Sequence, residues 1–255
     1  MPLRHRTSYL SFSRDFPGCD NRSVAASTNK SSKITLQEQL DRITQNTRAL
    51  VQPERLAISE RMVAELFATG IETGALKSGN MAPPFSLRDS QGRTVKSTDL
   101  LALGSLIVGF FRGRWDPYCV TELETWRDLY PEVRARDALF VAVSPQTIRQ
   151  NAFAVDQHRL PFPVLSDPGA EIAGQFGLSY AVSPEHRRYY QSILINIPFN
   201  NAGLNYQTAT EASWRLPIPA IYLIRQDGSI AFAEAHADHR VRPEPADVLS
   251  VLDSQ

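Results

Sequence analysis

One cysteine stands in a setting that can make a thiol reactive. Cys119 closes the run Trp115-Asp116-Pro117-Tyr118-Cys119, which follows a segment typical of a buried strand and precedes one with helical spacing. This order places Cys119 in the first turn of a helix, where free backbone N–H groups and the helix dipole favour negative charge. Because the thiolate is the reactive form, the position favours redox chemistry. A lone cysteine is also common as a small buried apolar residue, and spacing alone leaves the two interpretations level.

The charged neighbours of Cys119 would act on its pKa in opposite directions. Arg112 and Arg114 precede it, and a nearby guanidinium lowers a thiol pKa. A fall from about 8.5 to about 6.5 would raise the thiolate fraction at pH 7 from roughly 3% to roughly 75%. Asp116 would raise the pKa if both groups were charged and close, or would accept a hydrogen bond or the proton of the thiol. These roles of Asp116 stay open.

A proline supplies a second candidate for the same site. Pro219 lies in the run 216–220, directly before an apolar segment with strand character. A proline cannot donate to the sheet there, so it marks a strand boundary. It either forms a cis turn that brings a loop beside the cysteine, or it is trans and ends the preceding loop.

Metal and nucleotide sites have little support in the sequence. His236 and His239 are close together, but histidines at a strand end are usually surface residues and no second cluster supplies further ligands. Glycine-rich phosphate loops are absent. We therefore predict neither a metal nor a cofactor.

Composition narrows the class of protein. The chain has 255 residues, 42% of them hydrophobic and 21% charged, which suits a globular protein. Basic and acidic residues number 27 each, so no net field points to nucleic acid or an anionic membrane, and no apolar run is long enough to span a bilayer. Cys19 and Cys119 are the only cysteines, too few for a secreted disulfide framework. A cytoplasmic protein is expected.

The elements that must position Cys119 form an α/β domain. Residues 34–76 predict a leader of two helices, the first opened by the capping-box pair Thr35 and Glu38. Residues 77–255 predict one domain: a mixed central sheet with helices on both faces. Strands are expected at 85–87, 95–100, 106–111, 138–143, 162–165, 221–224 and 230–234, and helices at 122–135, 146–157, 170–176 and 246–252. Residues 183–213, rich in proline and asparagine, read as an insertion or long loop.

Residues 1–33 differ from the rest of the chain. They are rich in serine and arginine, contain two acidic residues and lack a sustained apolar period. A disordered tail, a start codon placed too far upstream and an organellar transit peptide all fit this composition. Cys19 lies here, and we assign it no role.

The order of several short motifs carries a family resemblance. The motifs are Gly79-Asn80-Met81-Ala82-Pro83-Pro84-Phe85, Phe110 to Cys119, Val143-Ser144-Pro145-Gln146-Thr147, Phe162 to Asp167, Leu216 to Ala220 and Arg242 to Asp247. Together they resemble the peroxiredoxin-like branch of the alkyl hydroperoxide reductase and thiol-specific antioxidant family. The resemblance implies a thioredoxin-like fold and thiol-based reduction of hydroperoxides, with electrons returned by thioredoxin or another thiol.

The resemblance also places the site residues. Members of this branch usually carry Cys-Pro-Tyr-Cys, whereas Asp116 stands here at the first position. By position Cys119 matches the peroxidatic cysteine and Asp116 the usual threonine. Pro219 occupies about the place of the arginine that precedes the closing strand, so that arginine is expected to be absent. Trp115, Pro117, Tyr118 and Pro219 are expected to line the site.

These departures predict a one-cysteine enzyme. Without a second cysteine in the motif, an intramolecular disulfide cannot form there, and an external thiol or another subunit must reduce the oxidised enzyme. We expect Cys119 to be the nucleophile, Asp116 to position or deprotonate it, and Arg112 to stabilise the thiolate. The alternative is a non-catalytic redox sensor or binding protein that has lost the first motif cysteine. A homodimer is compatible with either.

Overall fold

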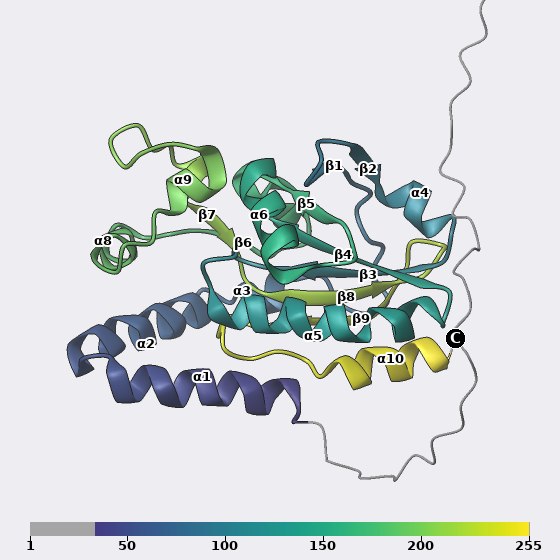
Figure 1. Ribbon diagram of the computed structural model, residues 1–255, viewed down its shortest axis with the longest axis horizontal. Coiled ribbons are helices and arrows are strands. Elements are labelled where there is room, and N and C mark those ends of the chain that lie inside the picture. Colours follow the sequence, from purple (N-terminus) through teal and green to yellow (C-terminus); the bar gives the residue numbers. More distant parts are fainter. Residues whose placement is uncertain (1–33, 255) are drawn as a thin grey trace, which may run out of the picture. The chain divides into compact units, whose positions relative to one another are not determined.

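The helical leader forms as predicted. The computed structural model describes residues 34–254, which begin with α1 (Leu36–Leu50), α2 (Pro53–Ala68) and the short α3 (Ile71–Gly74) (Figure 1). Thr35 caps α1, because its hydroxyl accepts from the Glu38 N–H at 3.1 Å while the Glu38 carboxylate accepts from the Thr35 N–H at 2.9 Å. The expected capping box is therefore present.

The described part of the main domain is built on a mixed sheet of seven strands, in the order β2-β1-β5-β4-β3-β8-β9. The strands are β1 (Ser86–Asp89), β2 (Thr94–Lys96), β3 (Ser105–Phe110), β4 (Ala138–Ser144), β5 (Val164–Ser166), β8 (Ala220–Ile224) and β9 (Ile230–Ala235). The β3-β4-β5 pairs are parallel and the other pairs are antiparallel. The predicted α/β class with a mixed sheet is confirmed.

Helices cover both faces of the sheet. Four of the helices after β3 are α5 (Pro117–Arg134), α6 (Ile148–His158), α7 (Glu171–Gln175) and α10 (Pro245–Asp253). Side chains of β3 alternate: Ile107 packs with Trp126 of α5 and Leu249 of α10, while Leu106 and its like-facing neighbours pack with α7. Both faces of β3 are buried because the run is apolar at every position, as expected for a central strand.

Two segments differ from expectation. The strand predicted at 95–100 stops at Lys96, and α4 (Ser97–Leu101) follows. Serine, threonine and aspartate are common at helix starts, and Ser97, Thr98 and Asp99 stand there. The Ser97 hydroxyl also accepts from the Phe85 N–H at 2.9 Å, which fixes the chain where it turns.

The second difference is the segment 183–213, which contains two helices where the sequence suggests an insertion or long loop. It contains α8 (Pro184–Ser192) and α9 (Ile197–Ala202), flanked by β6 (Ser179–Ala181) and β7 (Arg215–Pro217), which pair with each other. Ser183 caps α8 and Asn196 caps α9, each accepting a backbone N–H. The proline and asparagine residues that suggested a loop begin helices here, a role that both types also favour.

The helices of the described residues were compared with the length and apolar character that a membrane span needs. No helix between residues 34 and 254 is long and apolar enough to cross a membrane.

Candidate active site

Cys119 lies in the first turn of α5, as predicted. The helix begins at Pro117, whose missing N–H costs nothing at that position, and Asp116 is the N-cap. One Asp116 oxygen accepts from the Tyr118 N–H at 3.0 Å. Asp116, three positions before the thiol, thus holds the turn. This places its second carboxylate oxygen at the sulfur.

The sulfur lies between a carboxylate and a guanidinium. The Cys119 thiol donates to Asp116 Oδ2 at 3.2 Å, and Arg242 Nη2 donates to the same sulfur at 3.4 Å. Arg242 is itself held by Glu122, whose Oε2 accepts from Nε at 2.6 Å. Cys119 has no exposed surface, and the three charged groups are also buried.

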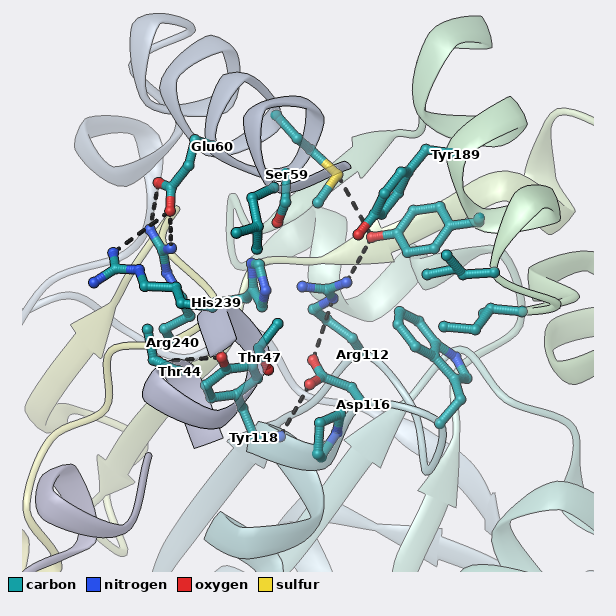
Figure 2. A pocket seen from close by; sticks show the side chains of 18 residues that line it. Thr44, Thr47, Ser59, Glu60, Arg112, Asp116, Tyr118, Tyr189, His239 and Arg240 are labelled. Atoms are coloured by element: carbon teal, nitrogen blue, oxygen red, sulfur yellow. Dashed lines mark hydrogen bonds and ion pairs between the residues drawn. The ribbon is translucent and has the colours of Figure 1, made fainter. Parts of the chain in front are cut away.

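Arg112 acts on the thiol indirectly, through Asp116. Its Nη2 donates to the Tyr190 hydroxyl at 2.6 Å, and its Nε lies 3.4 Å from Asp116 Oδ2. Its guanidinium also lies over the Trp115 ring, 4.9 Å from the centroid. Figure 2 shows the Arg112 guanidinium beside the Asp116 carboxylate, so Arg112 neutralises Asp116 more directly than it stabilises the sulfur.

Of the two opposite effects on the thiol pKa that the sequence left open, the one that raises it prevails here. Burial, and next the Asp116 charge, raise the pKa of Cys119 to about 12, against the opposing pull of Arg242 and Arg112. Two guanidinium groups already face two carboxylates, Asp116 and Glu122, in the same buried cluster. A thiolate would add an excess negative charge without water around it, which a helix terminus cannot offset.

Arg114, the other basic candidate, points elsewhere. Its N–H donates to Gln146 Oε1 at 2.6 Å and its Nε donates to Gln150 Oε1 at 2.9 Å. Its guanidinium lies 5.6 Å from the centre of the Phe153 ring. Arg114 thus ties the turn before α5 to Gln146 and α6, and makes no contact with the thiol among those found in residues 34–254.

Arg242 and Glu122 were missed as site residues. Arg242 stands 123 positions after Cys119, on the segment that leads into α10, and Glu122 looks like an ordinary exposed position of a helix. Pro219 stands where the arginine before the closing strand was expected to be absent, and Arg242, from a more distant segment, supplies a guanidinium at the thiol. The only sequence signal was the motif that starts at Arg242, which served for the resemblance and was given no role.

A pocket that Asp116 lines lies beside this cluster. Trp115, Pro117 and Tyr118 line it, together with Arg112 and residues of α1, α2 and α8 (Figure 2). Cys119 is not among its lining residues, whereas Asp116, which accepts from the thiol, is.

Pro219 lies apart from this pocket. It lines a smaller neighbouring cavity, together with Arg112 and His239. Every peptide bond between residues 34 and 254 is trans, so Pro219 follows the trans alternative. Pro219 therefore borders the site through Arg112 rather than through a cis turn beside the thiol.

His239 was expected to be a surface residue, but it is half-buried. It lines the pocket beside Asp116, and its ring meets Tyr118 edge-on at 5.4 Å between centroids. Burial, and next the charges of Arg112 and the two arginines nearby on its own segment, lower the pKa of His239 well below its usual value. The ring is therefore neutral at physiological pH.

The described residues contain no arrangement of side chains suited to a metal ion. Within residues 34–254 no group of three or more histidine, cysteine, aspartate or glutamate side chains is arranged to hold a metal ion. Cys19 lies outside the described residues, as does the whole segment 1–33.

Comparisons with known proteins agree on one family. The model of the AhpC/TSA family matches residues 78–233, more than half of the chain. Peroxiredoxin Bcp of Bacillus subtilis is 31% identical over 40% of this chain and 64% of its own length. The chloroplastic peroxiredoxin Q of Triticum aestivum is 26% identical over 44% of this chain and 51% of its own. The chain thus spans about half to two thirds of these relatives.

Solved structures show the same fold. The crystal structure of peroxidoxin BcpB from Mycobacterium tuberculosis aligns with a TM-score of 0.53 at 20% identity, over 70% of this chain and 97% of that one. A mutant of peroxiredoxin 6 from Arenicola marina also gives 0.53, at 16% identity, over 70% of this chain and 73% of that one. The thioredoxin-like fold of the peroxiredoxins is therefore the fold of this chain.

Proposed function

This chain belongs to the AhpC/TSA family, and from that premise we propose that it is a thiol peroxidase whose single nucleophile is Cys119. One observation carries the proposal: the sulfur lies between a proton acceptor, Asp116, and a cation, Arg242. The non-catalytic alternative is not favoured, since the curated relatives named above are peroxiredoxins.

The arrangement supports a balanced reaction. Asp116 accepts the thiol proton while the sulfur attacks one peroxide oxygen and the O–O bond breaks. The sulfur becomes a sulfenic acid, and the second oxygen leaves as an alcohol or water after taking the proton back from Asp116. Arg242 stabilises the negative charge that develops on the sulfur, and Arg112 forms an ion pair with Asp116. A thiol with a high pKa can react in this way because its proton leaves only as the bond forms.

Access to the sulfur requires a movement. Cys119 is fully buried and does not line the pocket, whereas Asp116 does. A peroxide that enters the pocket meets Asp116 and Arg112 first. We therefore include in the proposal a local opening of the first turn of α5 during turnover.

The reductant must come from outside the motif. Cys119 is a free cysteine, and Asp116 occupies the place of a partner thiol. We propose thioredoxin or another external thiol as the electron donor and the cytoplasm as the compartment. The wheat relative is named as chloroplastic, so the composition of residues 1–33 keeps an organellar location open.

The proposal is tested by peroxide turnover and by trapping of the intermediate. Reduced wild type and Cys119→Ser are supplied with hydrogen peroxide or an organic hydroperoxide, thioredoxin, its reductase and NADPH, and dimedone-treated samples are analysed by mass spectrometry. We expect a dimedone adduct on Cys119 and turnover in wild type alone. Equal turnover by Cys119→Ser, or oxidation of Cys119 by every peroxide no faster than that of free cysteine, would overturn the proposal.

A further inference from the structure

Arg112 carries its positive charge in a buried position with few partners. Its Nε lies 3.4 Å from Asp116 Oδ2, an ion pair in which Nε makes no hydrogen bond. The one hydrogen bond found for its guanidinium between residues 34 and 254 runs from Nη2 to the Tyr190 hydroxyl, at 2.6 Å. A neutral acceptor, as well as a carboxylate, therefore decides where this charge lies.

The ring of Tyr190 is fixed by packing. Tyr190 lies on α8, within the segment that the sequence suggested to be a loop, and it is 2% exposed. It belongs to an apolar cluster with Met62 and Trp214. Its ring meets that of Trp115 edge-on at 5.5 Å between centroids, and the Arg112 guanidinium lies over the same Trp115 ring. Because close packing limits the ring to one orientation, its hydroxyl is an acceptor at a fixed position.

The proton of the Tyr190 hydroxyl is directed away from Arg112. A guanidinium has only donors, so the hydroxyl must accept from it. The hydroxyl donates its own proton to Met62 Sδ at 3.6 Å, and Met62 is the buried residue of α2. Burial raises the pKa of Tyr190, so the hydroxyl is uncharged at physiological pH. Tyr190 thus holds Arg112 without neutralising its charge, which stays available to Asp116 and the sulfur.

The position of the Arg112 charge matters for the thiol. Burial and the Asp116 charge raise the pKa of Cys119, and the guanidinium groups of Arg242 and Arg112 oppose them. In the proposed reaction the thiol proton moves to Asp116 and negative charge develops on the sulfur. A cation that is held in place before the reaction stabilises this charge better than one that must first turn towards it.

We propose that Tyr190 is a positioning residue for the reaction of Cys119, and that it acts through Arg112, which it holds beside Asp116 (Figure 2). The inference rests on the proposed peroxidase function, since it assigns a further residue to that reaction. It also gives α8 a role: this helix carries the hydroxyl that fixes the buried guanidinium.

The test removes the hydroxyl alone, because Tyr190→Phe keeps the ring and its packing. The second-order rate constant for oxidation of the reduced full-length protein by hydrogen peroxide is measured from the sulfenic acid trapped at Cys119. The matched control is Tyr222→Phe. Tyr222 of β8 is also fully buried, its hydroxyl has no partner among the described residues, and it lines neither cavity that Arg112 lines. Thermal unfolding checks that each variant is folded.

We expect Tyr190→Phe to lower this rate constant about tenfold and Tyr222→Phe to leave it unchanged. A double-mutant cycle separates positioning from a merely structural role. In the background of Arg112→Met, Tyr190→Phe should lower the rate constant less than about twofold, because no guanidinium is left to position. A tenfold loss in both backgrounds, or no loss in the wild-type background, would overturn the inference and leave the peroxidase proposal standing.

The hold on Arg112 can also be measured without a peroxide, which decides the matter if Arg112→Met does not fold. The ¹⁵N relaxation of the Arg112 Nε–H group reports how firmly the guanidinium is held, and its signal is identified by its loss in Arg112→Lys. We expect an ordered group in wild type and in Tyr222→Phe, and a mobile one in Tyr190→Phe. Equal order in wild type and Tyr190→Phe would overturn the positioning role. If no peroxide oxidises Cys119 but the order is lost as expected, the peroxidase proposal fails and the hold on Arg112 stands.

Discussion

Two buried aspartates of this molecule begin as the same structural device. Asp116 and Asp167 are each 2% exposed and each stands just before helical residues. Asp116 accepts the Tyr118 N–H, and Asp167 accepts two N–H groups of α7, from Ile172 at 2.9 Å and from Ala173 at 3.0 Å. Both therefore satisfy backbone donors that a helix start leaves free.

The two aspartates differ in what the second oxygen contacts. Both oxygens of Asp167 accept backbone N–H groups, and among the described residues it forms no ion pair. One oxygen of Asp116 accepts from the backbone, and the other contacts Cys119 and Arg112. A capping aspartate is thus structural by default and becomes a candidate for chemistry when one oxygen is left for a reactive atom.

The strongest test of this difference is the ionisation of Cys119. Because burial and Asp116 raise the pKa to about 12, the thiol stays protonated at pH 9, where a free cysteine is about half or more ionised. The thiolate fraction there should be about a thousandfold smaller than for an unperturbed thiol. This thiolate fraction is measured as the difference in 240 nm absorbance between wild type and Cys119→Ser, followed from pH 6 upward. A midpoint below about 9 would contradict the buried, charge-balanced site.

Removal of Arg242 should cost the most stability. Arg242→Met leaves Glu122 buried without its cation, and breaking a buried pair in this way costs about 3 kcal/mol. Urea denaturation measures the free energy of unfolding. The double variant Arg242→Met with Glu122→Gln should recover a large part of the loss, since it removes the unpaired charge. A loss of stability in the double variant equal to that in the single one would show that Glu122 is not the cause.

Replacement of Asp116 should separate acidity from turnover. Asp116→Asn keeps an acceptor for the Tyr118 N–H but cannot take a proton, so kcat/KM should fall about 100-fold. The pKa of Cys119 should fall at the same time, because the carboxylate that raises it is gone. A more acidic thiol with lower turnover is the expected signature. Turnover that rises with the acidity of the thiol would mean that Asp116 is no proton acceptor.

Replacement of Asp167 should have the smallest effect and none on the thiol. Burial raises the pKa of Asp167, and its oxygens serve only α7. Asp167→Asn removes one of two good acceptors and should lower the free energy of unfolding by about 1 kcal/mol. The kcat/KM and the pKa of Cys119 should stay at their wild-type values. A change in either would mean that the two aspartates are coupled.

The fold was predictable where local pattern decides structure. The strand expected at 106–111 is β3, one residue earlier, because a run that is apolar at every position has no other place than the centre of a sheet. The helices α8 and α9 were not predictable, since Ser183 and Asn196 are equally common in loops and at helix starts. Only the packing of their apolar sides distinguishes the two outcomes.

The part of the site whose residues are close together in the sequence was predictable. Cys119 and Asp116 are three residues apart on a helix start, so their contact follows from helix geometry. Arg242 reaches the sulfur from 123 positions away, and nothing short of the tertiary fold brings it there. The direction of the thiol pKa shift could not be predicted for the same reason, because burial and the balance of four charges are properties of the folded chain.

The start of α1 depends on a residue near the other end of the chain. The N–H groups of Leu36 and Gln37 donate to the Glu244 carboxylate at 3.1 and 2.8 Å, across 208 and 207 positions. During synthesis the leader leaves the ribosome well before Glu244 does, so these two N–H groups meet their carboxylate only after Glu244 has emerged. The same late segment carries Arg242. We therefore expect the thiol site of the nascent chain to stay incomplete, and the start of α1 to lack this partner, until residues 242–244 have emerged.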